Sequence, residues 1–106
     1  MAKYLFAASY TKQGVEGIRA KGGQARADAI RSLAEGLGGT METFYFAFGD
    51  VDAFVIVDLP DDETAAAVAL AVGASGAAGV RTTKLLTPAQ VDAAAGKTVD
   101  YRPPGA

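Results

Sequence analysis

The chain begins with a run of aromatic and aliphatic residues, 3–10, that contains neither glycine nor proline. This composition predicts a β-strand. Thr11 follows the strand and can cap a helix. Val15 and Ile18 come next, before a break at residues 22–23, which are both glycine.

An amphipathic helix is predicted after this break. Its apolar residues recur at the i, i+3, i+4, i+7 spacing that places side chains on one helix face. These residues are Ile30, Leu33, Ala34 and Leu37. The glycine pair Gly38-Gly39 ends the helix.

The next two segments predict a β-hairpin. Residues 40–48 alternate strictly, and successive side chains of a strand point to opposite faces of the sheet. Gly49-Asp50 has the composition of a turn, and residues 51–59 are rich in Val, Ile and Phe. On this pattern one face carries Phe44, Phe46 and Phe48, and the other carries Met41, Thr43, Tyr45 and Ala47.

A second helix and a fourth strand are predicted after the hairpin. Pro60-Asp61-Asp62 ends the third strand and offers an aspartate cap, and Ser75-Gly76 closes the helix. Residues 80–86 then alternate as a strand. The apolar residues of the helix recur at Ala65, Val68, Ala69 and Val72. One face of the strand carries Val80, Thr82, Lys84 and Leu86. The other face carries Arg81, Thr83 and Leu85.

A short third helix is predicted by the capping box of residues 87–90, Thr-Pro-Ala-Gln, with proline at the first helical position. It carries Val91, Ala94 and Ala95 and stops at Gly96. We expect residues 1–96 to form one domain. Residues 97–106 form a proline-containing tail that is either loose or packed on a neighbouring molecule.

The order of elements predicts a ferredoxin-like βαββαβ fold of the α+β class, with an antiparallel four-stranded sheet and both major helices on one face. Both faces of the first three strands are largely apolar, whereas the two alanine-rich helices cover one side only. The open face measures about 400 Å² from standard strand dimensions. Burial against a second copy of the chain is therefore expected, and the alternative is that this face is polar enough to stay solvated.

Charge and composition limit where the protein is located and what it binds. The chain has 106 residues, a formal net charge of -2 and no cysteine. Nothing in that charge attracts nucleic acid or an anionic membrane, and the first apolar run is too short for a signal sequence. We expect a cytoplasmic protein that binds neither nucleic acid nor membrane.

Several stretches, which together span nearly the whole chain, carry a family resemblance: residues 3–10, 44–49 leading into Asp52, 68–72, 82–88 and 101–106. On these residues the chain resembles the GYD-domain family, a group of small bacterial proteins among the dimeric α/β barrels. In the segment that names the family Gly49 and Asp52 match, whereas Val51 stands where the family usually has tyrosine. The resemblance implies the fold and the dimer, and it implies no reaction, because the family has no established activity.

The absence of histidine and cysteine excludes several kinds of chemistry. Histidine or cysteine is required for three kinds of site: Ser-His and Cys-His nucleophiles, thiolate or imidazole zinc sites, and His- or Cys-ligated haem. Ser75 lies at a helix end and lacks a base. We expect no catalytic residues of these classes and no cofactor.

Two other clusters have simpler explanations than a ligand. Five aspartates lie around the third strand, but hairpin turn and helix cap account for most of them, so no metal site is predicted; Asp52 is the least explained. The Gly22-Gly23 pair, flanked by Arg19, Lys21 and Arg26, places backbone amides and positive charge where an anion can sit, although a helix break explains the glycines.

The space between two facing sheets is the expected ligand site. On strand phase, one set of polar candidates comprises Ser9, Thr43, Tyr45, Asp52 and Thr83, and the opposite phase carries Tyr10 and Lys84. Either set can face inward, because a shift of one residue reverses a strand. These side chains can also be satisfied interface groups with no ligand.

Three functions remain from the sequence. The first is a homodimer that binds a small, partly apolar molecule between its sheets. The second, by analogy of fold alone, is a cofactor-free enzyme of the monooxygenase or isomerase kind, in which Tyr45, Tyr10, Asp52 or Lys84 acts as acid or base. The third is a structural homo-oligomer joined through edge strands or the tail.

Overall fold

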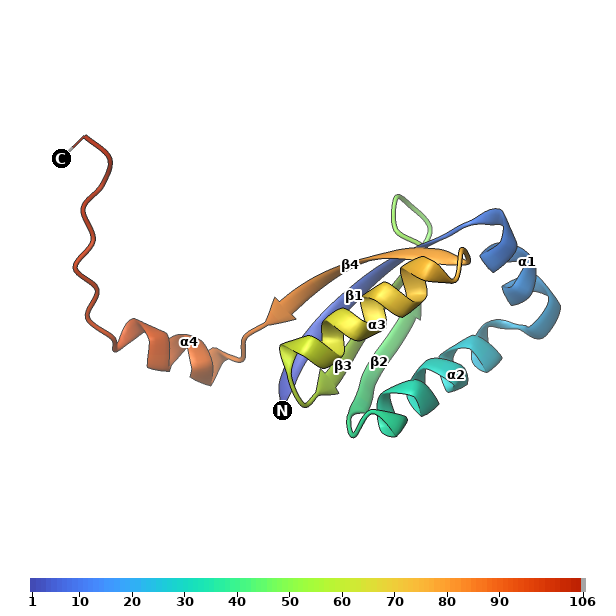
Figure 1. Cartoon of the computed structure of the whole chain (residues 1–106), viewed down its shortest axis with the longest axis horizontal. Coiled ribbons are helices and arrows are strands. Elements are labelled where there is room, and N and C mark those ends of the chain that lie inside the picture. The colour runs from blue at the N-terminus through green and yellow to red at the C-terminus, as the bar shows by residue number, and fades with distance from the viewer. Residues whose placement is uncertain (106) are drawn as a thin grey trace.

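The computed structural model describes residues 1–105, so Ala106, the last residue of the predicted tail, lies outside the described residues. Figure 1 shows a twisted four-stranded sheet, a layer of helices on one of its faces, and an arm that leaves the body at the C-terminal end. No described helix has the length and apolar character that crossing a membrane requires.

The sheet has the strand order β2-β3-β1-β4 and is antiparallel throughout. Its strands are β1 (Ala2–Tyr10), β2 (Thr40–Phe46), β3 (Ala53–Leu59) and β4 (Ala78–Leu85). The two central strands β1 and β3 pair with each other, with Phe6 opposite Val55. This arrangement confirms the predicted ferredoxin-like α+β fold.

The first helical segment forms two helices, α1 (Lys12–Lys21) and α2 (Gly23–Gly36). Thr11 caps α1, because its side chain accepts a hydrogen bond from the backbone N–H of Gly14. Gly22 separates the helices with a φ of 91°, a left-handed value that glycine adopts without steric cost. The predicted glycine break therefore turns the chain, and α1 lies beyond the end of the sheet while α2 runs beside it (Figure 1).

The core lies between the sheet and helices α2 and α3 (Asp62–Ala74). Alternate residues of β1 and β3 point into it, and the helices contribute small side chains. Ala34 of α2 is fully buried and Ala65 of α3 is nearly so. Other core members are Tyr4, Phe6, Val55, Val57 and Leu59.

Strand β2 departs from the predicted strict alternation. The register shifts between Met41 and Thr43, which is a β-bulge at Glu42. Met41 consequently pairs with Val57 and packs against the core, so its predicted place beside Thr43 and Tyr45 was wrong. The bulge leaves the Glu42 side chain free to reach Lys3 on the opposite face.

The C-terminal arm consists of α4 (Pro88–Ala95) and the tail that follows it. The predicted capping box is present, with Thr87 and Gln90 exchanging hydrogen bonds. Every residue from 88 to 105 is exposed, and Figure 1 shows the arm standing away from the body. The Cα radius of gyration is 16.9 Å, above the about 13 Å of a compact chain of this length, because the arm is extended.

Candidate ligand site on the open face of the sheet

The face of the sheet turned away from the helices carries apolar and polar side chains in similar numbers. Each strand contributes to it, since alternate side chains of a strand share a face. Phe54 is 40% exposed and Tyr45 is 70% exposed, although both belong to regular strands. The remaining apolar members are Leu5, Ala7, Ile56 and Leu85. We call this surface the open face.

One end of the open face carries a charged cluster. Lys3 Nζ lies 2.7 Å from Glu42 Oε1 and 3.1 Å from Asp58 Oδ2. The hydrogen bonds to Glu42 and Asp58 raise the pKa of Lys3, because they favour its charged form. One lysine thus ties together three adjacent strands, β1, β2 and β3.

The other end of the open face is hollowed. The hollow has a volume of about 510 Å³, and its floor is formed by Ala7 and Ser9 of β1. Asp50 lies on one side of it, and Gly79 and Arg81 of β4 lie on the other. It therefore combines small apolar side chains with a hydroxyl, a carboxylate and a guanidinium, and such a mixture can bind a small molecule.

The hairpin loop of residues 47–52 forms the wall on the Asp50 side. Asp52 holds this loop against β1, because its backbone N–H donates to Ala8 O at 2.9 Å and its Oδ2 accepts from Tyr10 N–H at 2.8 Å. Ser9 Oγ donates to Asp50 O at 3.4 Å. The carboxylate of Asp52, which turn composition left unexplained, thus has a structural role in positioning the loop.

A family model described as GYD domain matches residues 4–95. This covers the sheet except for the first two residues of β1, and all four helices up to the end of α4. The chain belongs to the GYD-domain family. No curated protein and no solved structure matches it. In this GYD-domain protein Asp50 and Val51 of the family segment line the hollow.

Six of the seven predicted site residues divide between the two faces in the phases expected, whereas Asp52 lies in the loop before β3. Ser9, Thr43, Tyr45 and Thr83 lie on the open face, and Tyr10 and Lys84 lie on the helix face. They are not brought together, however. Tyr45 of β2 and Thr83 of β4 lie on the two edge strands, about 14 Å apart across three strand spacings. Of the seven predicted residues, Ser9 lines the hollow.

Lys84 belongs to a cluster at the beginning of α3. Its Nζ lies 2.9 Å from Asp62 Oδ1, and the Tyr4 hydroxyl donates to the same oxygen at 2.5 Å. The hydrogen bond to Asp62 raises the pKa of Tyr4 to about 12. The hydrogen bonds from Tyr4 and then Lys84 lower the pKa of Asp62. A phenol held protonated in this way is poorly suited to act as a general base.

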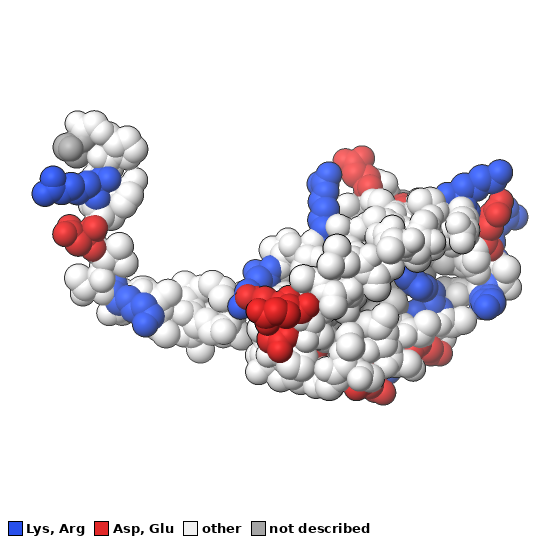
Figure 2. Space-filling model, in the orientation of Figure 1, with Lys and Arg blue, Asp and Glu red and all other residues white. Residues whose placement is uncertain are grey.

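The other aspartates of the predicted cluster have separate partners. Asp61 caps α3 by accepting from the Thr64 N–H at 2.8 Å, and Asp58 pairs with Lys3. In residues 1–105 no three potential ligands lie close enough to hold a metal ion. Figure 2 shows acidic side chains gathered where α3 begins, and charged side chains of both signs around α1 and α2.

Two residues that line the hollow, Asp50 and Arg81, were not among the predicted ligand contacts. The signal for Arg81 was available, because it shares a strand face with Thr83. In the sequence, the position of Asp50 in a predicted turn explains this residue without a ligand. Its position opposite Ser9 depends on how the loop folds back onto β1, which no local pattern indicates.

Proposed function

We propose that this GYD-domain protein is a homodimer that joins its open faces and binds a small, partly apolar molecule between them. The observation that carries the proposal is the hollow of about 510 Å³ in the open face, which is lined by both apolar and polar side chains. A hollow open to solvent holds a ligand poorly, because part of the ligand stays in water. A second sheet laid over it would enclose the ligand.

The exposed apolar side chains support a second copy as the cover. Apolar side chains form one continuous patch on the open face: Phe54, Tyr45, Leu5, Ile56 and Leu85. Soluble proteins rarely leave such a patch exposed to solvent. A standard interface buries about 800 Å² on each partner. The open face supplies about half of that from strand dimensions, so further contacts are needed.

The charges on the open face also suit self-association. The strands bring two cations, Lys3 and Arg81, and two anions, Glu42 and Asp58, to this side of the sheet. With Asp50 of the hairpin loop these charges sum to -1, so charge repulsion between two copies of the face is small. The cluster of Lys3 lies at one end and Arg81 toward the other, which permits favourable pairing across a two-fold axis.

The arm supplies the additional contact. Val91, Val99 and Tyr101 are all more than half exposed. Covering such side chains with an apolar surface lowers the free energy of the protein. The arm extends away from its own body and therefore does not receive this cover there. In the proposed dimer the arm lies on the partner subunit.

Native mass spectrometry of the full chain, taken directly from the expressing cells, tests the dimer and the ligand together. We expect a dimer with a retained small molecule. Phe54→Glu places a charge in the centre of the open face and should give monomers. Leu70→Glu makes the same kind of change on the exposed outer side of α3 and should leave the dimer intact. A wild-type monomer, or dissociation of both variants alike, would overturn the dimer.

The ligand has its own variant. Gly79 lines the hollow, and a Cβ at this position meets nothing within 4 Å. Gly79→Val therefore fills the hollow without a clash inside the subunit. We expect this variant to remain a dimer and to lose the retained molecule. Retention of the molecule in Gly79→Val would place the ligand elsewhere.

A further inference from the structure

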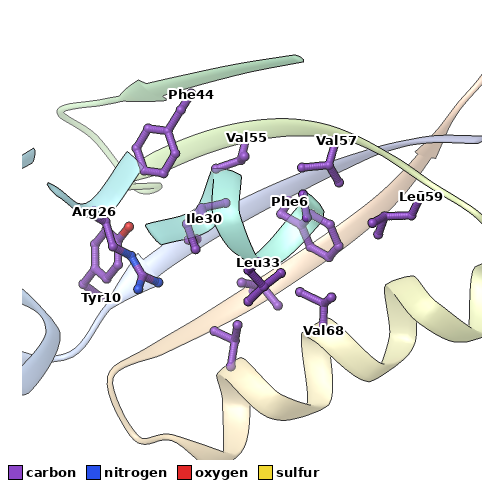
Figure 3. Close-up of a pocket in the computed structure, with 14 residues that line it drawn as sticks. Phe6, Tyr10, Arg26, Ile30, Leu33, Phe44, Val55, Val57, Leu59 and Val68 are labelled. Atoms are coloured by element: carbon purple, nitrogen blue, oxygen red, sulfur yellow. The ribbon is translucent and has the colours of Figure 1, made fainter. Parts of the chain in front are cut away.

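Two hollows meet on the other side of the sheet, at Tyr10 and Arg26. The first is a core cavity of about 40 Å³ between the sheet, α2 and α3, lined by apolar side chains such as Phe44, Val55 and Val80. The second is a cleft of about 320 Å³ between α1 and α2. Figure 3 shows Tyr10 and Arg26 together at one end of the core cavity, with the apolar residues extending away from them.

Arg26 is the unusual member of this group. Its Nε is buried and has no hydrogen-bond partner among the described residues. The guanidinium lies 5.7 Å from the centre of the Tyr10 ring, a cation–π contact that leaves the Nε–H without an acceptor. Arginine keeps its charge in proteins, and buried polar groups are nearly always hydrogen-bonded. An acceptor is therefore missing from this site.

The residues around Arg26 do not supply a balancing charge. In residues 1–105, the charged residues that line the two hollows are Arg26 and Lys21, both positive. No ion pair involves either of them in that part of the chain, whereas Arg31 on the same helix pairs with Asp28 at 2.9 Å. A water molecule can accept from Nε, but no acidic side chain lines either hollow to balance the charge of Arg26.

The shape of the site selects the class of anion. The planar guanidinium donates to a carboxylate through two parallel hydrogen bonds. The cleft is lined by small residues, among them Gly14, Gly17, Ala25 and Ala29, and thus has room for a small molecule. The core cavity behind Arg26 accepts one or two carbon atoms and offers no polar partner, which disfavours a fully hydrated anion such as phosphate.

We propose that the cleft between α1 and α2 binds a small organic acid. The carboxylate lies against Arg26, with Lys21 at the mouth of the cleft, and the apolar end of the acid points toward the core cavity. This site lies on the helix face of the sheet. It is separate from the hollow on the open face and does not depend on the dimer.

Titration of the full chain with butyrate, followed by ¹H–¹⁵N NMR, tests the proposal. We expect the Nε–H resonance of Arg26 to shift in a saturable way. Butyramide, which has the same size and no charge, should leave this resonance in place. An unmoved Arg26 resonance, or equal shifts with the two probes, would overturn the site. Equal saturation by inorganic phosphate would refute the assignment to an organic acid.

Three variants make the test specific. Arg26→Gln should weaken butyrate binding by about tenfold or more, since a charge-assisted hydrogen bond is lost. Arg19→Gln makes the same change on exposed α1, away from the cleft, and should bind as wild type. Gly17→Leu fills the cleft at a position where a Cβ meets nothing within 4 Å, and it should abolish binding while the protein stays folded. Unchanged binding in Gly17→Leu contradicts the proposal even if Arg26→Gln fails to fold.

Discussion

Asp62 joins two strands of the sheet to the beginning of α3. Tyr4 comes from β1 and Lys84 from β4, and both donate to Asp62 Oδ1. Asp62 also lies in the first turn of α3, where a negative charge interacts favourably with the helix dipole. The ionised form of this carboxyl is thus stabilised in the folded protein.

The lowered pKa of Asp62 predicts a pH-dependent effect of Tyr4→Phe. The folded state binds a proton less readily than the unfolded state, so the stabilisation is present above the ordinary carboxyl pKa of about 3.8 and is lost as the pH falls through the folded value. Tyr4→Phe removes the largest cause of the shift. Urea unfolding should therefore show a larger loss of stability for Tyr4→Phe at pH 7 than at pH 3.

Tyr101→Phe is the control for that measurement, because Tyr101 lies in the exposed tail. It should match wild type at both pH values. A Tyr4→Phe deficit of the same size at pH 7 and pH 3 would mean that the hydroxyl contributes by packing alone.

At the scale of elements, sequence motifs predicted those features that depend on contacts between residues close together in the chain. The capping box at Thr87 and Gln90 involves residues three apart, and α4 begins where it was expected. The bulge in β2 could not be predicted in this way, because Glu42 pairs with Lys3, 39 residues earlier. The same limit applies to the candidate site: strand phase placed Ser9 and Thr83 on one face, but the fold of the 47–52 loop depends on distant backbone groups of β1.

The position of α1 depends on a close approach at one glycine. A Cβ on Gly14 would lie 2.1 Å from Ala77 O, a backbone atom beside the hydrogen bond from Thr11 N–H to the same oxygen. Gly14→Ala should therefore destabilise the fold by about 1–3 kcal/mol. Gly17→Ala, on the same helix in open space, should instead stabilise it by about 1 kcal/mol. Urea unfolding of the two variants measures both changes, and equal effects would contradict this packing of α1.

At the scale of the whole molecule, the body and the arm are distinct. The body buries its core between sheet and helices, while residues 88–105 are exposed throughout. The sequence predicted a helix and a tail here, but periodicity carries no information on whether a segment folds back onto its own domain. The extent of 57 Å along the longest axis is the consequence.

Removal of residues 87–106 tests the role of the arm. The stability of the body should change by less than about 0.5 kcal/mol, because few of its contacts are lost. Dimer dissociation, measured by sedimentation velocity, should become at least about tenfold easier, since apolar side chains such as Val99 and Tyr101 lose their cover. An unchanged dissociation constant would show that the arm does not cross to the partner.

The capping box of α4 affects the conformational entropy that the arm would lose when two subunits of the proposed dimer associate. A segment of eight residues is marginally helical by itself, and ordering it at the moment of binding would cost conformational freedom. Thr87 and Gln90 satisfy the free amides at the start of the helix, so part of that loss has already occurred before two molecules meet. In the proposed dimer, the strength of association would thus be set in part by two residues that need not touch the other subunit.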